Sequence, residues 1–140
     1  MSVFQKRSLE TNFGNIYLTT LDKILKGDNI NTPLVLTIDE NDWKIKHVPV
    51  LDLVPSEKPT MVIQCSRKHI CCTPDHFVLT TDGYKRADKI EIGDRVVLSN
   101  LANTFVTGLI KELKVRPVYD VYLDGGTNHS CFQLIVKSAN

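Results

Sequence analysis

The sequence lacks an excess of charge of either sign. Lys and Arg number 17, Asp and Glu number 16, and the formal net charge is +1. This balance gives no field that would attract DNA, RNA or anionic lipid, so we expect no nucleic-acid partner and no membrane partner. Long apolar runs and the apolar core of a signal peptide are also missing. These absences predict a cytoplasmic location.

Cysteine is scarce, and its placement argues against disulfide bonds. The cysteines are Cys65, Cys71, Cys72 and Cys131. Three crowd together and one lies far away, unlike the even spread of a secreted disulfide framework, so reduced thiols are predicted. His69 and His76 lie near Cys71 and Cys72 and could suggest a metal site. Neighbours in a strand point to opposite faces, however, so these cysteines cannot easily share one ion, and we expect neither a metal nor a cofactor.

What the sequence does contain is a series of short apolar stretches separated by polar turns. The stretches are Ile16–Leu18, Leu34–Ile38, Met61–Ile63, Phe77–Leu79, Arg95–Leu98, Val118–Tyr122 and Phe132–Val136. Many short strands with turns such as Asp82-Gly83 between them predict a compact all-β domain. Short helical turns are expected at Thr20–Leu25 and Ala87–Ile90. The length of 140 residues suits a single domain, residues 1–140.

An internal repeat is the most informative feature of the chain. The segment Asp22–Asp28, DKILKGD, recurs as Asp88–Asp94, DKIEIGD. Each copy follows a glycine turn, at Gly14 or Gly83, and each precedes a predicted strand. We interpret the repeat as a duplication in which two similar β units pack together and bury a shared core. The alternative is that Gly-Asp is simply a common turn.

A stretch in the middle of the chain resembles a known family. It begins Cys72-Thr73-Pro74-Asp75-His76 and continues through Asp82-Gly83-Tyr84 to Gly93-Asp94. This is similar to the T-x-x-H segment of inteins and of the hedgehog autoprocessing domain, with the pattern that follows it in both. Taken alone, the segment Thr73–His76 is also typical of an ordinary turn between strands.

The end of the chain carries the second part of the resemblance. Val118-Tyr119-Asp120-Val121 is followed by His129 and by the terminal Asn140, as in the C-terminal segment of inteins. The resemblance implies the Hint (hedgehog/intein) fold, a horseshoe-like all-β domain with a pseudo-two-fold internal repeat. It also implies autocatalytic protein splicing by a mini-intein, which is an intein without a homing endonuclease.

The resemblance assigns the first splicing step to Ser2 and the T-x-x-H segment. A hydroxyl beside a peptide bond can attack the preceding carbonyl and shift the acyl group from nitrogen to oxygen. Many inteins of this kind start with cysteine, so Ser2 is either natural or a substitution that slows the reaction. His76 would protonate the departing nitrogen, because histidine has a pKa near operating pH. Thr73 would fix the geometry of the bond or stabilise the oxyanion, and Asp75 would orient His76.

The later steps are assigned to the C-terminal segment. Asp120 lies inside an apolar strand, where a carboxylate is costly to bury without a role, and the resemblance makes it the activator of the downstream nucleophile. His129 would assist the last step, in which the Asn140 side chain attacks its own carbonyl and cuts the chain. The penultimate histidine of many inteins is replaced here by Ala139. Asp120 on an edge strand and His129 in a loop could also be ordinary solvent-facing residues.

The resemblance also sets the expected boundaries and partners. The splicing domain would run over about residues 2–140, with Met1 as a start residue or flank. The partners would be the flanking extein sequences of a host protein, whose location the domain follows, and we expect a monomer. Residues 100–107 would form a mobile surface loop where other inteins carry their endonuclease.

Two other functions stay open at this point. A hedgehog-like or bacterial intein-like autoprocessing domain would cleave its flank without ligation. A non-catalytic β-barrel binding module would require an exposed aromatic patch, and aromatic residues make up only 7% of this chain. In each splicing or cleaving case the domain acts once on itself, so it is not an enzyme with turnover.

Overall fold

The computed structural model describes residues 2–5, 7–27, 32–131 and 134–139. These residues form strands in two antiparallel sheets, one α-helix, α1 (Leu18–Lys26), and one 3-10 helix, η1 (Ala87–Lys89). The prediction of an all-β fold is therefore confirmed, and both expected helical turns are present. No helix among the described residues has the length and apolar character to cross a membrane.

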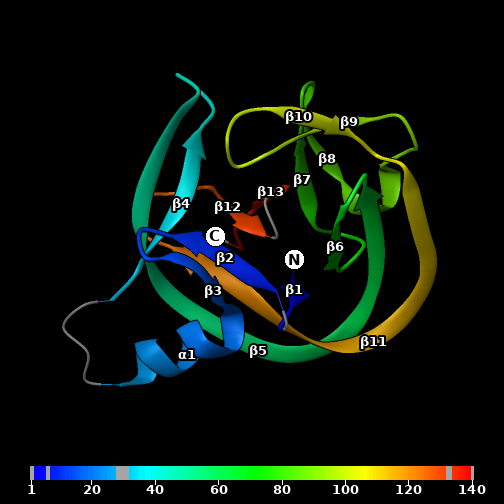
Figure 1. Cartoon of the computed structure of the whole chain (residues 1–140). Coiled ribbons are helices and arrows are strands. Elements are labelled where there is room, and N and C mark those ends of the chain that lie inside the picture. The colour runs from blue at the N-terminus through cyan, green and yellow to red at the C-terminus, as the bar shows by residue number, and fades with distance from the viewer. Residues whose placement is uncertain (1, 6, 28–31, 132–133, 140) are drawn as a thin grey trace.

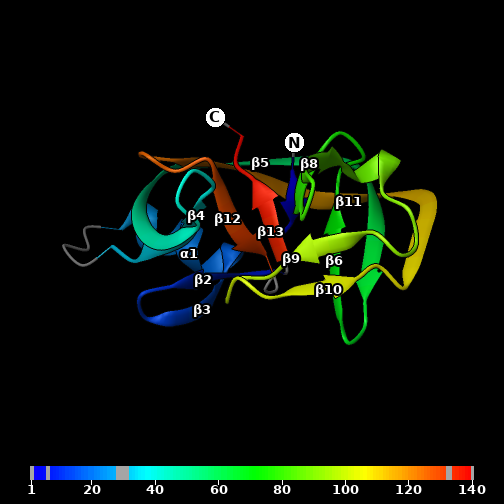
Figure 2. The ribbon, with the colours of Figure 1, turned by 90° about the horizontal axis from the view of Figure 1, so that it is seen from above.

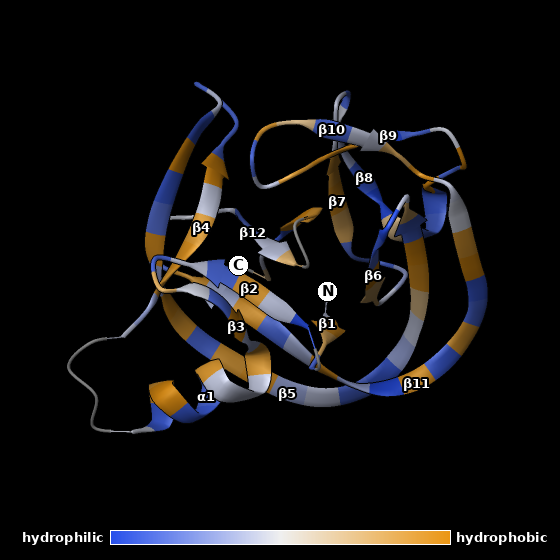
Figure 3. Ribbon diagram, viewed as in Figure 1, coloured by the Kyte–Doolittle hydropathy of each residue, from blue (hydrophilic) through white to orange (hydrophobic). Residues whose placement is uncertain are grey.

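The larger sheet is built around two long curved strands. In spatial order its strands are β11 (Gly108–Leu123), β1 (Val3–Phe4), β6 (Lys68–Cys72), β5 (Lys44–Cys65), β4 (Leu34–Asp39), β2 (Ser8–Thr11) and β3 (Gly14–Tyr17). Strand β11 also pairs with β5, from Gly108 opposite Gln64 to Leu123 opposite Val50. This pairing carries the two strands side by side around the horseshoe-like frame in Figure 1. Apolar residues recur along both strands rather than in one block (Figure 3).

The smaller sheet lies inside this frame. Its spatial order is β10 (Asn103–Phe105), β9 (Arg95–Val97), β7 (Phe77–Thr80), β13 (Leu134–Lys137) and β12 (Asn128–Cys131), and β8 (Gly83–Arg86) pairs with β7. The two sheets share one main core, to which Leu9, Leu21, Ile63, Val78 and Leu134 contribute fully buried side chains. The core also takes in cysteine side chains, and all four cysteines of the chain are buried free thiols, as predicted.

Two hairpins repeat the same local structure and support the duplication. In β2–β3, the Thr11 hydroxyl donates to the Gly14 carbonyl over 2.7 Å, and in β7–β8 the Thr80 hydroxyl donates to the Gly83 carbonyl over 2.6 Å. Both glycines have the positive φ that side chains disfavour, +94° at Gly14 and +104° at Gly83. The quoted Asp-Lys-Ile copies are not equivalent, however. Residues 22–24 lie well inside the nine-residue α1, whereas residues 88–90 begin in the three-residue η1.

The expectation of a loop over all of residues 100–107 is wrong, because part of this stretch is a strand, while its place as the endonuclease insertion point stays a prediction. Asn103–Phe105 forms β10, which pairs in register with β9. The Val106 side chain is buried, and its amide donates to the Asp94 carbonyl over 2.8 Å. Only the tight turn before β10, where Leu101 has a positive φ of 70°, matches the expected loop. Polar residues in this stretch form an edge strand, whose outer side faces water.

Candidate functional site

Ser2 is fully buried at the centre of the frame, although it lies at the start of the chain. The next residue, Val3, is held on both sides by β1 pairings, opposite Cys72 of β6 and Tyr119 of β11. The long strand β11 thereby brings the start of the chain against the second half of the sequence. This burial excludes a loose terminal segment for Ser2.

Thr73 lies directly against the main chain of Ser2. The Ser2 amide donates to the Thr73 hydroxyl over 2.9 Å, and the Thr73 amide donates to the Ser2 carbonyl over 3.0 Å. The Ser2 nitrogen belongs to the peptide bond between residues 1 and 2, so the Thr73 hydroxyl touches one atom of that bond. The turn that holds Thr73 is closed by a hydrogen bond of 3.0 Å from the His76 amide to the Thr73 carbonyl.

His76 connects the start of the chain with its last strand. Its Nδ1 lies 3.2 Å from the Ser2 carbonyl oxygen, and its Nε2 lies 2.8 Å from the Lys137 carbonyl oxygen on β13. A neutral imidazole has one N–H, so it can donate to only one of these two acceptors. The shorter contact favours the proton on Nε2, which leaves Nδ1 without a proton beside Ser2.

The electrostatics of His76 differ from the sequence-based expectation. Complete burial, and then the proximity of His129, lower the pKa of His76 to about 3. The expected pKa near neutrality is therefore wrong, and His76 is a neutral imidazole at physiological pH. In that state it can accept a proton and pass it on, but it does not carry the second proton of an imidazolium ion.

The hydroxyl of Ser2 meets two charged groups. It donates to Asp120 Oδ1, and it accepts from the ammonium of Lys58, whose Nζ lies 2.9 Å from Oγ. Lys58 Nζ and Asp120 Oδ1 form an ion pair of 3.6 Å. Asp120 thus contacts Ser2, in addition to any later role, and its carboxylate can accept the Ser2 hydroxyl proton.

The two described ends of the chain meet on β11. The Ser2 hydroxyl binds Asp120, and the Ala139 amide donates to the carbonyl of the next residue, Val121, over 2.8 Å. Seen from above, the chain begins and ends on the same side of the frame (Figure 2). Groups from both ends can therefore act on a shared site. Met1 and Asn140 lie outside the described residues.

Comparison with known proteins identifies the fold. No family model matches the sequence, and no curated protein matches it. The structure, however, superposes on the DnaB intein from Synechocystis sp. PCC 6803 with a TM-score of 0.83 over 99% of both chains, at 17% identity. The chain has the Hint fold of the mini-inteins. The expected fold is thereby confirmed.

Two further structures share the Hint fold with this chain. The DnaX mini intein from Spirulina platensis gives a TM-score of 0.80 at 18% identity, covering 99% of this chain and 100% of the other. A bacterial intein-like domain from Clostridium thermocellum gives 0.82 at 17% identity, covering 98% of both chains. The Hint fold is thus common to inteins and to an intein-like domain, and the fold by itself does not decide between ligation and cleavage.

The C-terminal part of this Hint domain contains a second set of buried polar atoms. His129 is fully buried on β12, its Nδ1 lies 3.1 Å from the Ser130 carbonyl, and its Nε2 has no hydrogen-bond partner among the described residues. Burial lowers the pKa of His129 to about 4. The Ser138 hydroxyl, two residues before the end of the chain, is also buried and has no partner in the described part. His129 is therefore not a solvent-facing loop residue.

Asp75 is the most exposed of the predicted site residues that the structure describes. Burial raises the pKa of its carboxyl group, but the hydrogen bond with the Thr73 hydroxyl and the smaller influence of nearby groups such as His76 together outweigh burial, so that the pKa of Asp75 is lowered. Asp75 therefore orients Thr73 as well as lying near His76. Within the described residues, no group of three or more His, Cys, Asp or Glu side chains could hold a metal ion.

Lys58 is the site residue that sequence reasoning missed. It lies in the run Pro55-Ser56-Glu57-Lys58-Pro59, where no motif singles it out. Only the register of β5 against β11, with Lys58 opposite Arg116 and Val54 opposite Asp120, places its side chain near Ser2. A contact that depends on the register of two long strands leaves no local signal in the sequence.

Proposed function

We propose that this chain is an autocatalytic protein-splicing domain, which excises itself and joins the two extein segments that flank it. The observation that carries the proposal is the burial of Ser2 among groups that engage its amide, its hydroxyl and its carbonyl separately. Mere anchoring of a chain end does not require such a set of contacts. The shared fold of the DnaB and DnaX inteins supports the proposal.

In the proposed first step, Ser2 Oγ attacks the carbonyl carbon of residue 1. The new Oγ–C bond forms, the C–N bond breaks, and a peptide becomes an ester without consuming water. The hydroxyl proton leaves to Asp120 and is returned to the freed nitrogen, which becomes an amine, so the step consumes no net proton. The Thr73 hydroxyl accepts a hydrogen bond from the Ser2 N–H and holds this nitrogen in place. His76 is neutral, and its Nδ1 lies 3.2 Å from the Ser2 carbonyl oxygen, so it can take up a proton and pass it on beside this nitrogen.

The remaining steps are proposed for the other end of the chain. A hydroxyl or thiol at the start of the downstream extein takes over the acyl group, and the Asn140 side-chain nitrogen then attacks its own carbonyl and cuts the chain. Ala139 cannot polarise this bond as a histidine would. We assign that role to His129, whose buried Nε2 has no partner among the described residues. The excised domain is a monomer, and its partners are its exteins.

The test is a fusion protein that carries a folded domain on each side, with serine as the first downstream residue. We expect a product in which the two flanks are joined, together with the free domain that begins at Ser2, both resolved by intact-mass measurement. A control with Ser2→Ala and Asn140→Ala should stay uncut. Released but unjoined flanks would assign the chain to the autoprocessing domains, and a protein that never reacts would contradict the proposal.

A further inference from the structure

We propose that Lys58 is a catalytic residue of the first acyl shift, and that together with Asp120 it fits this site to a serine nucleophile. The inference rests on the proposed splicing function and specifies the nucleophile for which the site is built. Its basis is the Lys58 ammonium, which lies 2.9 Å from the oxygen that would attack.

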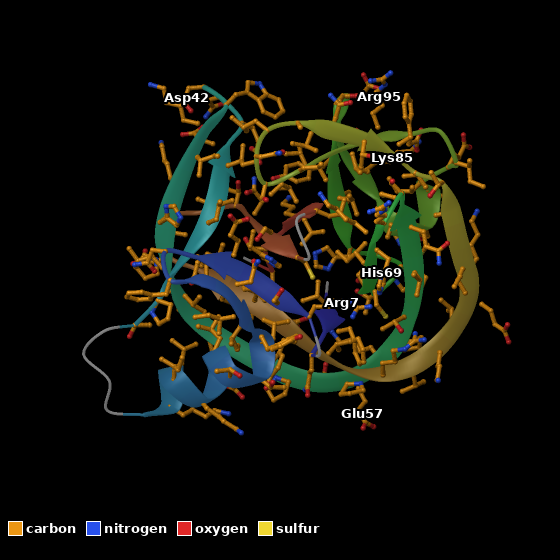
Figure 4. All side chains as sticks on the ribbon, in the orientation of Figure 1. Arg7, Asp42, Glu57, His69, Lys85 and Arg95 are labelled. Atoms are coloured by element: carbon orange, nitrogen blue, oxygen red, sulfur yellow. The ribbon has the colours of Figure 1, made fainter. Side chains whose placement is uncertain are left out.

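The placement of Lys58 follows from strand geometry. Side chains alternate between the two faces of a strand, so Glu57 and Lys58 on β5 point in opposite directions. Glu57 is exposed and points outward from the frame (Figure 4). Lys58 therefore points inward, where it reaches both Ser2 Oγ and Asp120 Oδ1.

A serine hydroxyl needs more help than a cysteine thiol. The thiol loses its proton at a pKa of about 8.5, whereas an alcohol is almost never ionised near neutral pH. Here Asp120 accepts the hydroxyl proton, and the Lys58 ammonium keeps its own protons and stabilises the negative charge that grows on Oγ. As the Oγ–C bond forms, that charge passes to the carbonyl oxygen, and the C–N bond then breaks.

A merely structural ion pair would give different results. The Lys58 side chain is 38% exposed, and ion pairs at such positions contribute little to stability. Removal of its charge should therefore change the unfolding midpoint only slightly. A large loss of reaction rate without a matching loss of stability would separate catalysis from scaffolding.

The experiment combines two substitutions in a fusion with an upstream flank. The rate of ester formation is measured by hydroxylamine-induced release of that flank. We expect Lys58→Met to slow release roughly 100-fold with Ser2 present, the size of effect seen when one charge-stabilising donor is removed. In the Ser2→Cys background the loss should be no more than about tenfold, because the thiol ionises on its own. Lys58→Arg should recover most of the rate.

The controls make each outcome decisive. Lys111→Met removes an exposed lysine of β11 and should leave the Ser2 rate unchanged. Equal losses in the serine and cysteine backgrounds, or no loss in either, would overturn the role of Lys58 while leaving the splicing function in place. If the unsubstituted protein forms no ester at all, the proposed function itself is wrong, and this inference is overturned with it.

Discussion

Replacement of Asp120 by asparagine is expected to slow the first acyl shift roughly 100-fold or more, the usual contribution of a positioned general base. Asp120 is the group to which the Ser2 hydroxyl donates its hydrogen bond. Asparagine has the same shape and can still accept that hydrogen bond, but it cannot take up the proton. The measurement is the half-time of upstream-flank release by hydroxylamine.

The matched control for this substitution is Glu57→Gln. It removes a carboxylate from the neighbouring strand β5, but the Glu57 side chain is exposed and points away from the site (Figure 4). Its release rate should equal that of the unsubstituted protein. An Asp120→Asn protein that forms the ester at the normal rate would restrict Asp120 to the later step, the activation of the downstream nucleophile.

Acidification from pH 7.5 to pH 5 is expected to remove about 4 kcal/mol from the free energy of unfolding, about 2 kcal/mol for each of two histidines. The pKa values of His76 and His129 are about 3 and about 4 in the folded protein, because burial disfavours the imidazolium. In the unfolded chain both titrate near 6.5. Between these pKa values the unfolded state binds more protons than the folded state. The contribution of the two neutral histidines to the free energy of unfolding is therefore fully present above pH 6.5, and it is lost as the pH falls toward the folded-state pKa values.

Urea midpoints measured between pH 5 and pH 8 test this expectation. His76→Gln and His129→Gln should each reduce the pH dependence by about half, whatever they do to stability at neutral pH. His69, whose pKa is also lowered by burial and by Arg7, adds to the residual dependence. His47→Gln is the control, because His47 is exposed. A dependence that survives the loss of both buried histidines would show that other groups govern the acid sensitivity.

Some of the site was predictable because its chemistry is local in the sequence. Thr73 and His76 belong to one turn and lie three residues apart, so the sequence alone indicates that they lie close together. Asp120 was recognisable as a carboxylate inside an apolar strand. These residues do come together around Ser2 in the structure. Their roles in splicing remain predictions.

The parts of the site and of the fold that the sequence did not predict depend on features that no short segment encodes. Lys58 reaches Ser2 only through the register of β5 and β11, and the length of these strands was hidden by their polar and proline-containing stretches. Both strands lie on the outer frame, where one face is in water, so their apolar pattern is interrupted. Residues 103–105 were predicted to lie in a loop for a similar reason, because an edge strand needs few apolar residues. The neutral state of His76 follows from complete burial, which composition does not reveal.

The central claim, that the peptide bond before Ser2 becomes an ester in this site, can be tested by one measurement. A fusion with an upstream flank, carrying Asn140→Ala so that the C-terminal step is blocked, is treated with hydroxylamine and its products are weighed by mass spectrometry. The account predicts that the flank is released as a hydroxamate at its last residue, and that Ser2→Ala abolishes this release. An upstream flank that stays attached, or one that is released equally from the Ser2→Ala protein, would contradict the account.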